Sequence, residues 1–545
     1  MSEQLKKNFY QHPQEQQETI IPYTDTNPEY RETPLISPIP RPTIESCPPL
    51  TQSQLQTIER GAGSTYMINT NTRQQQQQHY LPNRMNFQPV SSSIHSRQRQ
   101  REKIPLPLKP ESRQQISQMQ SSLFSLASAA DIERQNNSDF LYCRIPFDAT
   151  RELEGLKMVI GKPSPPDYDV FCSAKIVDGL FERKHRLSTI PHEKLTAARG
   201  KSNPYEKTSN SIFINRAAVK LACLDATNRL TGKKFPNKRP YRFADICGGP
   251  GGFSEYILWR KHVNGEDVYG WGITLIGDKD FVPEKFHPDS GVDDCYEIIY
   301  GADGTGDICK EENIREFGRI ILDKTMGAGV DLVVADGGID FRGFEQEQET
   351  RMRQLILCQV TTMFLALQQN GEFVLKVFDV FTQFTAGIIW ILYRHFKCIR
   401  IQKPEPSRPA NSERYIICRG LHQSRPTITN YLFDINRKLN DLSRRRSRGE
   451  HEEQDIIQIV EFEEMKKDES FMQYLKNSNE KIALEQSKAL DELLRYVHNP
   501  ELKPKNQEEI RRERFAQWLL PIEEHHRRSG GNSGRQETNY SRHNY

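Results

Sequence analysis

Four charged side chains, Lys220, Asp336, Lys376 and Glu413, are the residues of this chain best suited to acid–base chemistry. Lys376 interrupts the apolar stretch 373–378, and a lysine in such a strand is rarely tolerated without a partner or a role. Burial and a neighbouring cation lower the pKa of a lysine, so that it can accept a proton. Lys220 supplies that cation, while Asp336 and Glu413 oppose its effect and orient the group. Taken singly, Lys220 also fits a helix surface, Asp336 a helix cap and Glu413 a rim charge.

A glycine-rich turn lies between the first two of these residues in the chain, at Cys247-Gly248-Gly249-Pro250-Gly251-Gly252-Phe253. A short apolar stretch runs into it, and an amphipathic helix is predicted over residues 254–262. Glycines at a strand-to-helix turn let the backbone approach a ligand closely. The G-x-G-x-x-G dinucleotide fingerprint fails, because the sixth position from Gly249 is Ser254. The pattern predicts a cofactor turn, and the alternative is a turn with a purely structural role.

A second cluster of acids and glycines follows the third predicted strand, at residues 301–308. Asp303 and Asp307 can accept hydrogen bonds from an amine or from ribose hydroxyls. The structural alternative, a solvated connection with a helix cap, applies above all to Asp303. The spacing of the acids does not match a calcium loop.

Alternating strand and helix patterns position these groups. Helices are predicted over residues 211–228, 345–369 and 382–396. Such alternation is typical of an α/β fold with a mostly parallel, doubly wound sheet. The last two strands are joined by a loop too short for a parallel crossover, so one strand is antiparallel, as in Rossmann-like methyltransferases. The predicted strands are 242–247, 268–275, 296–300, 331–335, 372–378, 397–402 and 415–418.

Composition divides the chain into four parts. Residues 1–137 are rich in Gln, Pro and Ser, with the run 74–78 of Gln alone, and are predicted to be disordered. Residues 138–430 form the predicted α/β domain. A charged helical extension follows over 431–524, with helices at 480–497 and 507–518, and a polar tail over 525–545 is predicted to be disordered.

Charge and cysteine usage restrict the class of protein. The net charge is +3, from 75 basic and 72 acidic residues, so nucleic-acid binding would depend on local patches. The ten cysteines form no C-x-x-C pair, which fits a reducing compartment. The longest apolar run, near residues 384–392, is too short to cross a membrane. These features predict a soluble intracellular protein without a membrane partner.

Together, the turn and the four charged residues predict methyl transfer from S-adenosyl-L-methionine to a ribose hydroxyl. The methyl carbon of a sulfonium is already a strong electrophile, so that the protein mainly aligns the reacting atoms. A lysine base is sufficient for the hydroxyl, and no metal is predicted, since no cluster of His and Cys ligands appears.

At this point the sequence resembles a known family. The K-D-K-E set with a GPGGF turn resembles the FtsJ-type ribose 2′-O-methyltransferases. Longer strings resemble, within that family, the enzymes that act on the first nucleotide of capped mRNA. The resemblance covers about residues 139–520, through the segments 203–206, 215–220, 243–259, 303–307, 335–338 and 407–415.

This resemblance implies roles for individual residues. Lys376 would accept the proton, and Lys220, Asp336 and Glu413 would complete the catalytic site. S-adenosyl-L-methionine would contact Asn215, the turn from Cys247 to Phe253, Asp307 and Ile308. RNA or the 7-methylguanosine cap would contact Lys184, Arg199, Gln346 and Asn411.

The resemblance also implies capped mRNA as the substrate, a nuclear location and an association with the transcription or capping machinery. The basic cluster of residues 444–448 is an import signal, an RNA contact or a solvated helix end. Two other functions remain open on the sequence alone. One keeps the chemistry but changes the substrate to rRNA, tRNA or the second cap nucleotide, and the other is a catalytically silent RNA-binding platform.

Overall fold

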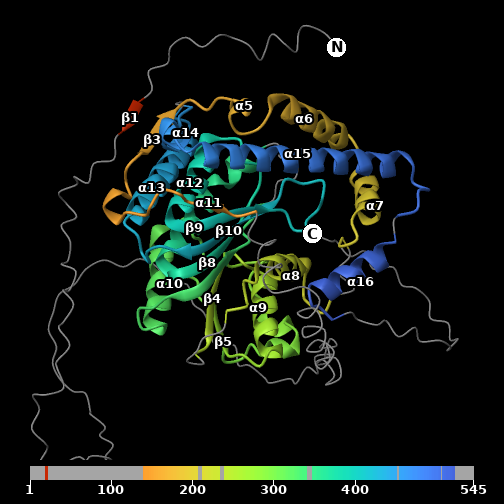
Figure 1. Ribbon diagram of the computed structural model, residues 1–545, viewed down its shortest axis with the longest axis horizontal. Coiled ribbons are helices and arrows are strands. Elements are labelled where there is room, and N and C mark those ends of the chain that lie inside the picture. Colours follow the sequence, from red (N-terminus) through yellow and green to blue (C-terminus); the bar gives the residue numbers. More distant parts are fainter. Residues whose placement is uncertain are drawn as a thin grey trace, which may run out of the picture. The chain divides into compact units, whose positions relative to one another are not determined.

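A mixed sheet of eight strands lies at the centre of the computed structural model (Figure 1). The structure describes residues 139–206, 211–233, 239–339, 347–450, 453–504 and 506–521, and the backbone of 19–21. The strand order is β2-β9-β10-β8-β7-β4-β5-β6. Their bounds are β2 (Leu141–Tyr142), β4 (Tyr241–Ile246), β5 (Val268–Ile273), β6 (Tyr296–Ile298), β7 (Val330–Ala335), β8 (Leu367–Val377), β9 (Phe396–Gln402) and β10 (Arg414–Leu421).

The directions of the strands confirm the predicted fold class. Strands β6, β5, β4, β7 and β8 run parallel to one another, whereas β10 is antiparallel to both β8 and β9. The register of β10 sets Tyr415 opposite Lys376. The edge strand β2 is too short to be recognised in the sequence. It pairs antiparallel with β9, on the side of β9 that faces away from β10.

Both faces of this sheet are buried, so its central strands read as continuous apolar runs. In β7, Leu332 and Val334 face one half of the core, and Val333 and Ala335 face the other. Figure 1 shows α8 and α9 on one side of the sheet and α10 and α11 on the other. The bounds of the helices next to the sheet are α8 (Arg216–Asn228), α9 (Gly252–Val263), α10 (Glu311–Lys324), α11 (Gln348–Ala366), α12 (Gln383–His395) and α13 (Ile428–Ser447).

Local chemistry explains where two of these helices differ from the prediction. Helix α8 begins at Arg216 rather than near residue 211, because the Asn215 side chain accepts from the backbone N–H of Ala217 at 2.8 Å and caps the helix. Helix α11 ends at Ala366, three residues before the predicted end. The chain continues directly into β8, where Leu367 pairs with Val330.

A second, three-stranded sheet has the order β1-β3-β11, with β1 (Thr19–Ile21), β3 (Leu156–Gly161) and β11 (Asp455–Val460). Strand β11 was not predicted, because a short apolar run stands there in charged surroundings. Its partner β3 lies about 300 residues upstream, so that only the fold brings the two together.

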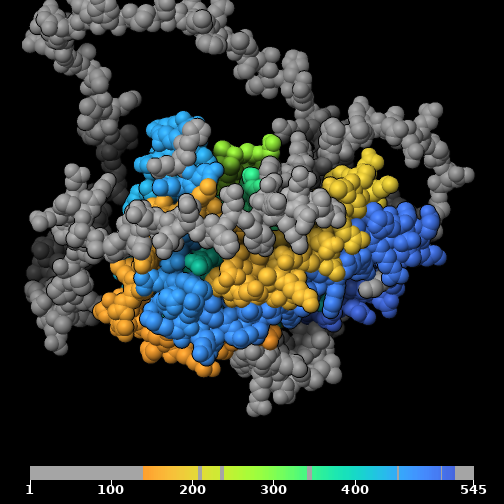
Figure 2. Space-filling model, turned by 90° about the horizontal axis from the view of Figure 1, so that it is seen from above, coloured from red at the N-terminus to blue at the C-terminus, as the bar shows by residue number. Residues whose placement is uncertain are grey.

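The remaining helices are α5 (Tyr168–Phe171), α6 (Ala174–Ser188), α7 (His192–Ser202), α14 (Phe462–Lys466), α15 (Glu469–His498) and α16 (Gln507–Gln517). Short 3-10 turns cover Ala149–Arg151, Pro283–Lys285 and Pro288–Ser290. The long helix α15 packs against α6 and α7 through an apolar cluster that includes Leu180, Ala198 and Leu490. Figure 2 shows α15, in blue, beside the gold helix α6.

Within the described ranges, no helix is long and apolar enough to cross a membrane. The apolar run near residues 384–392 instead forms the buried interior of α12. All cysteines in this part of the chain are free thiols. Most of residues 1–137, the tail over 525–545 and the position of Gln346 lie outside the described residues.

Candidate active site

The four charged residues singled out above come together at the carboxyl edge of the sheet as two ion pairs. Lys376, near the end of β8, lies 3.1 Å from Asp336 Oδ1 and donates to the backbone carbonyl of Asp336 at 2.7 Å. Lys220, on α8, lies 2.8 Å from Glu413 Oε1. All four side chains are at most 14% exposed, so that they interact in a medium of low polarity.

The backbone around Lys376 leaves room for its ammonium group. A Cβ atom on Gly338 would lie 3.2 Å from Lys376 Nζ, so a larger residue would crowd the lysine. On the neighbouring strand, the Tyr415 hydroxyl donates to Asp336 Oδ1 at 2.7 Å. Asp336 therefore receives a proton donor from two sides, and its carboxylate is fixed relative to Lys376.

Glu413 acts as the negative centre between the two lysines. Burial alone would raise the pKa of Glu413, but the ammonium groups of Lys220 and Lys376 outweigh this effect and hold it well below its usual range. The Ser407 hydroxyl also donates to Glu413 Oε1. The carboxyl group is thus ionised at neutral pH and offsets the charges of the two lysines.

A third lysine, Lys403, contacts the segment that carries Asn411 and Glu413, and this residue was not predicted as part of the site. Its Nζ contacts the Asn411 backbone oxygen at 2.8 Å, Asn411 Oδ1 at 2.9 Å and the Glu413 backbone oxygen at 3.0 Å. Burial lowers the pKa of Lys403 to about 7, and the charges of Arg414 and Lys220 act in the same direction against that of Glu413. Three acceptors require three N–H donors, which only the ammonium form has. Lys403 in that form fixes the segment that carries Asn411 and Glu413.

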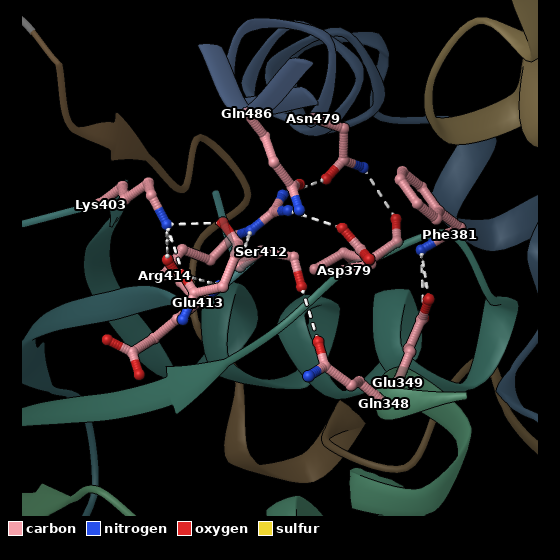
Figure 3. A network of polar contacts seen from close by, with 12 residues as sticks. Gln348, Glu349, Asp379, Phe381, Lys403, Ser412, Glu413, Arg414, Asn479 and Gln486 are labelled. Carbon is pink, nitrogen blue, oxygen red and sulfur yellow. Dashed lines mark hydrogen bonds and ion pairs between the residues drawn. The ribbon is translucent and has the colours of Figure 1, made fainter. Parts of the chain in front are cut away.

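A buried polar network anchors the same segment from the other side (Figure 3). Arg414 donates to Asp379 Oδ1 at 3.0 Å, to Asn479 Oδ1 at 2.8 Å and to the Ser412 carbonyl at 3.0 Å. Gln486 donates to the Ala410 carbonyl at 3.1 Å. Because Asn479 and Gln486 belong to α15, the C-terminal extension takes part in shaping the site.

The glycine turn is tight, and its own packing requires glycine. Gly251 has φ +111°, a conformation that other residues rarely adopt, and a Cβ there would lie 2.4 Å from the Phe286 ring. Cys247 has φ +57° and donates its N–H to the Ile273 carbonyl at 2.7 Å. Gly252 lies directly against the Asn215 side chain, since a Cβ would be 2.2 Å from Asn215 Oδ1. The turn thus joins β4, β5 and the start of α8 at one edge.

Two buried polar atoms beside this turn have no hydrogen-bond partner among the described residues, and this fits a polar ligand there. They are Asp245 Oδ1 and Gln359 Nε2. Burial raises the pKa of Asp245 to about 7, although a 2.7 Å hydrogen bond from the Ser254 hydroxyl opposes this shift. Gln359 Oε1 accepts from the Gly337 N–H at 3.1 Å, so that the amide faces the region between Cys247 and the Asp336 loop.

The two acidic residues of the loop after β6, Asp303 and Asp307, differ in their hydrogen-bond partners. The Asp303 carboxylate accepts hydrogen bonds from Lys310, from the Thr305 N–H at 2.9 Å and from Asn313 Nδ2 at 2.8 Å, and these bonds, the one from Lys310 above all, lower its pKa. This matches the structural alternative stated for Asp303. Asp307 Oδ1 accepts one bond, from the Cys309 N–H at 2.9 Å, and Ile308 is buried.

The residues predicted to contact RNA are spread over three elements. Lys184, on α6, lies 3.4 Å from Asp379 Oδ2 and is largely buried, so that it already forms an ion pair within the protein. Arg199 lies in the last turn of α7. Asn411 accepts from Lys403 through both of its oxygen atoms. Among the described residues, no group of three or more His, Cys, Asp or Glu side chains stands together as in a metal site.

This edge of the sheet is similar to a known family of proteins. Residues 213–421 match the FtsJ-like methyltransferase family model, and this range includes the glycine turn and all four charged residues. This part of the chain is thus similar to FtsJ-like methyltransferases. The helix α15, which anchors Arg414, lies beyond the residues that match this FtsJ-like domain.

Two relatives are similar well beyond the FtsJ-like domain. Cap-specific mRNA (nucleoside-2′-O-)-methyltransferase 1 of Dictyostelium discoideum is 41% identical over 368 residues, which cover 65% of this chain and 47% of the relative. The protein of the same name from Xenopus laevis is 37% identical over 380 residues, or 67% of this chain and 44% of the relative. The chain thus spans less than half the length of these relatives.

Among solved structures, a protein assigned as a ribosomal RNA methyltransferase from Plasmodium falciparum is 21% identical. It covers 38% of this chain and 98% of its own, with a TM-score of 0.30.

Proposed function

We propose that this chain transfers a methyl group from S-adenosyl-L-methionine to the ribose 2′-hydroxyl of the first transcribed nucleotide of 7-methylguanosine-capped mRNA. The observation that carries the proposal is the close pairing of Lys376 with Asp336 and of Lys220 with Glu413 beside the glycine turn. The names of the two relatives support the choice of capped mRNA over other RNAs.

In this proposal Lys376 is the proton acceptor. The hydroxyl proton of the ribose 2′-oxygen would pass to Lys376 Nζ, which must first give up the extra proton that it carries as the ammonium partner of Asp336. S-adenosyl-L-methionine supplies an electrophilic methyl carbon on a sulfonium. Asp336 and Tyr415 orient the lysine, and Glu413 neutralises the charge of Lys220. The protein's main contribution is alignment of the hydroxyl with the methyl carbon.

The cofactor would be held by Asn215, the turn from Cys247 to Phe253, Asp307 and Ile308. The two partnerless polar atoms of Asp245 and Gln359 support a ligand with polar groups at this place. Asp307 can accept further hydrogen bonds from hydroxyls, since one of its oxygens is used only by the Cys309 N–H.

Arg199, Asn411, Lys184 and Gln346 remain proposed contacts of the RNA or the cap. Arginine and lysine suit phosphates, and Asn411 lies two residues from Glu413 on the segment fixed by Lys403. For Lys184, a phosphate would have to compete with Asp379, so we expect it to contribute less than Arg199. A nuclear location and a link to the transcription or capping machinery also stay proposals.

The test is methyl transfer from labelled S-adenosyl-L-methionine to one RNA in capped and uncapped forms. The variants are Lys376→Ala and, as a matched control, Lys397→Ala, which removes an exposed lysine from the start of β9, at the opposite edge of the sheet. We expect label on the first ribose of capped RNA, lost in Lys376→Ala and kept in the control, with cofactor binding unchanged in both variants.

Other outcomes separate the alternatives. Label on an internal ribose, or on the second nucleotide, would retain the chemistry and change the substrate. Cofactor or RNA binding without any transfer would favour a silent RNA-binding platform. Equal activity of Lys376→Ala and the wild type would refute the assignment of Lys376 as the proton acceptor.

A further inference from the structure

The C-terminal end of α13 carries four arginines within five residues, Arg444, Arg445, Arg446 and Arg448, which we call the arginine cluster. All four are exposed. Together with Asp441 and Glu450, three of them line a surface hollow of about 490 Å³. None of them takes part in the chemistry proposed above.

The course of α13 brings the arginine cluster to the catalytic edge of the sheet. Because β10 is antiparallel to its neighbours, it ends at the edge opposite the active site, and α13 starts from there. Asn436 and Asn440 then donate to the Cys309 carbonyl at 2.9 and 3.0 Å, two residues beyond Asp307. Arg444 lies one helical turn further on, so that α13 ends past the cofactor side of this edge.

The ion pairs of Asp455 also place the arginine cluster near the active site. Asp455, at the start of β11, pairs with Arg446 at 3.6 Å and also with Arg353. Arg353 is in the second turn of α11, the helix that follows the Asp336 loop. The arginine cluster therefore lies near the start of α11, on the same side of the molecule as Asp336.

The four arginines differ in their internal partners. Arg445 pairs with Asp441 at 3.1 Å, and Arg446 pairs with Asp455. Arg444 and Arg448 form no ion pair with another residue that the structure describes, and both line the hollow. Arginines with exposed, uncommitted guanidinium groups bind phosphate through paired N–H donors. A row of such groups fits a chain of phosphates better than a single anion.

We infer that the arginine cluster binds the phosphate backbone of the RNA downstream of the methylated nucleotide, and this rests on the proposed function. The contact is independent of sequence, because it involves phosphates and not base edges. It adds affinity for long transcripts and adds nothing for an RNA that consists of the cap and a few nucleotides.

The test is equilibrium binding to the full chain of two RNAs, one with the cap and a few nucleotides and one extended by several tens of nucleotides. The variant is Arg444→Gln/Arg448→Gln. The matched control is Arg319→Gln/Lys324→Gln, which removes two exposed positive charges at the opposite edge, in the last turns of α10. Thermal unfolding checks that both variants keep the wild-type fold.

We expect the arginine variant to bind the long RNA at least several-fold more weakly, with unchanged affinity for the short one. The slope of log affinity against log salt should become shallower by about 1.4, because two phosphates of a single strand are no longer neutralised. Unchanged affinity for the long RNA would refute the inference and favour an acidic protein partner or an import receptor. Equal weakening in the control would also refute it, as an effect of net charge.

Because binding is measured without catalysis, failure of this inference can be told apart from failure of the proposed function. A protein that methylates short capped RNA but binds long RNA no more tightly overturns only the inference. A protein that binds long RNA through the arginine cluster without methylating capped RNA overturns only the proposed function.

Discussion

The buried pair of Arg414 and Asp379 yields the most quantitative prediction. The Arg414 guanidinium is 1% exposed, and Asp379 is its only acidic partner among the described ion pairs. Replacing Asp379 by Ala leaves that charge with two neutral acceptors, the Asn479 side chain and the Ser412 carbonyl. Removing one member of a buried ion pair typically costs about 3–5 kcal/mol. We expect Asp379→Ala to lower the free energy of unfolding by this amount.

Replacing Arg414 instead of Asp379 should lower the free energy of unfolding by a smaller amount. In Arg414→Met, Asp379 keeps the Lys184 ammonium at 3.4 Å, so its carboxylate is not left without a countercharge. In the double variant Asp379→Ala/Arg414→Met, no guanidinium remains to be compensated. The loss of stability in the double variant should therefore be smaller than the sum of the single losses, by about 1–3 kcal/mol.

Urea unfolding of the wild type and the three variants measures these values, and Ala410→Ser, on the same segment, serves as a mild control. We also expect Asp379→Ala to weaken methyl transfer, since Arg414 follows Glu413 directly. Additive losses in the double variant, or a loss below about 1 kcal/mol in Asp379→Ala, would show that Arg414 does not depend on this carboxylate.

Three further predictions concern single side chains. Tyr415→Phe removes the 2.7 Å hydrogen bond to Asp336, and we expect about a tenfold lower turnover at unchanged cofactor affinity, matching a loss of about 1–1.5 kcal/mol; unchanged turnover would contradict the orienting role. Because the pKa of Lys403 is lowered to about 7, the cost of burying its ammonium is fully present below pH 7 and is lost as the pH rises towards the ordinary value of 10.5. The wild type should therefore gain stability relative to Lys403→Met between pH 7 and 9 in urea unfolding, and parallel curves would speak against it. Because the pKa of Asp245 is raised to about 7, folding is favoured by its proton at low pH, and this contribution falls away between about pH 4 and 7. Asp245→Asn should thus be more stable than the wild type at pH 8 but not at pH 4, which thermal unfolding at the two pH values would show.

The sequence predicted the parts of the site that local patterns reveal. Lys376 stands out as a charge inside an apolar strand, and the glycine turn as a strand-to-helix connection. Asp336 was recognisable because it follows the end of a parallel strand, where ligands bind in such sheets. Glu413 precedes β10, and the antiparallel direction of that strand brings its start to the same edge. The observed ion pairs of Lys376 and Lys220 agree with this grouping.

The supporting residues could not be predicted in the same way. Arg414 and Asp379 contact each other across 35 residues, and Asn479 reaches Arg414 from 65 residues away. Nothing in the sequence near Asn479 distinguishes it from other polar residues on a charged helix. Lys403 follows a strand end, where an exposed lysine is the common case, and it is partly buried because the loop that carries Asn411 and Glu413 folds back over it.

The contacts of α15 with the active-site segment affect how a truncated gene of this type should be interpreted. A premature stop codon between positions 422 and 478 would leave every residue that matches the family and all four charged residues of the site intact. The shortened product would nevertheless lack Asn479 and Gln486, and Arg414 and the segment before Glu413 would lose these anchors. We expect such alleles to be inactive although their motifs are complete, so gene models of this type should be judged on α15 as well as on the motifs.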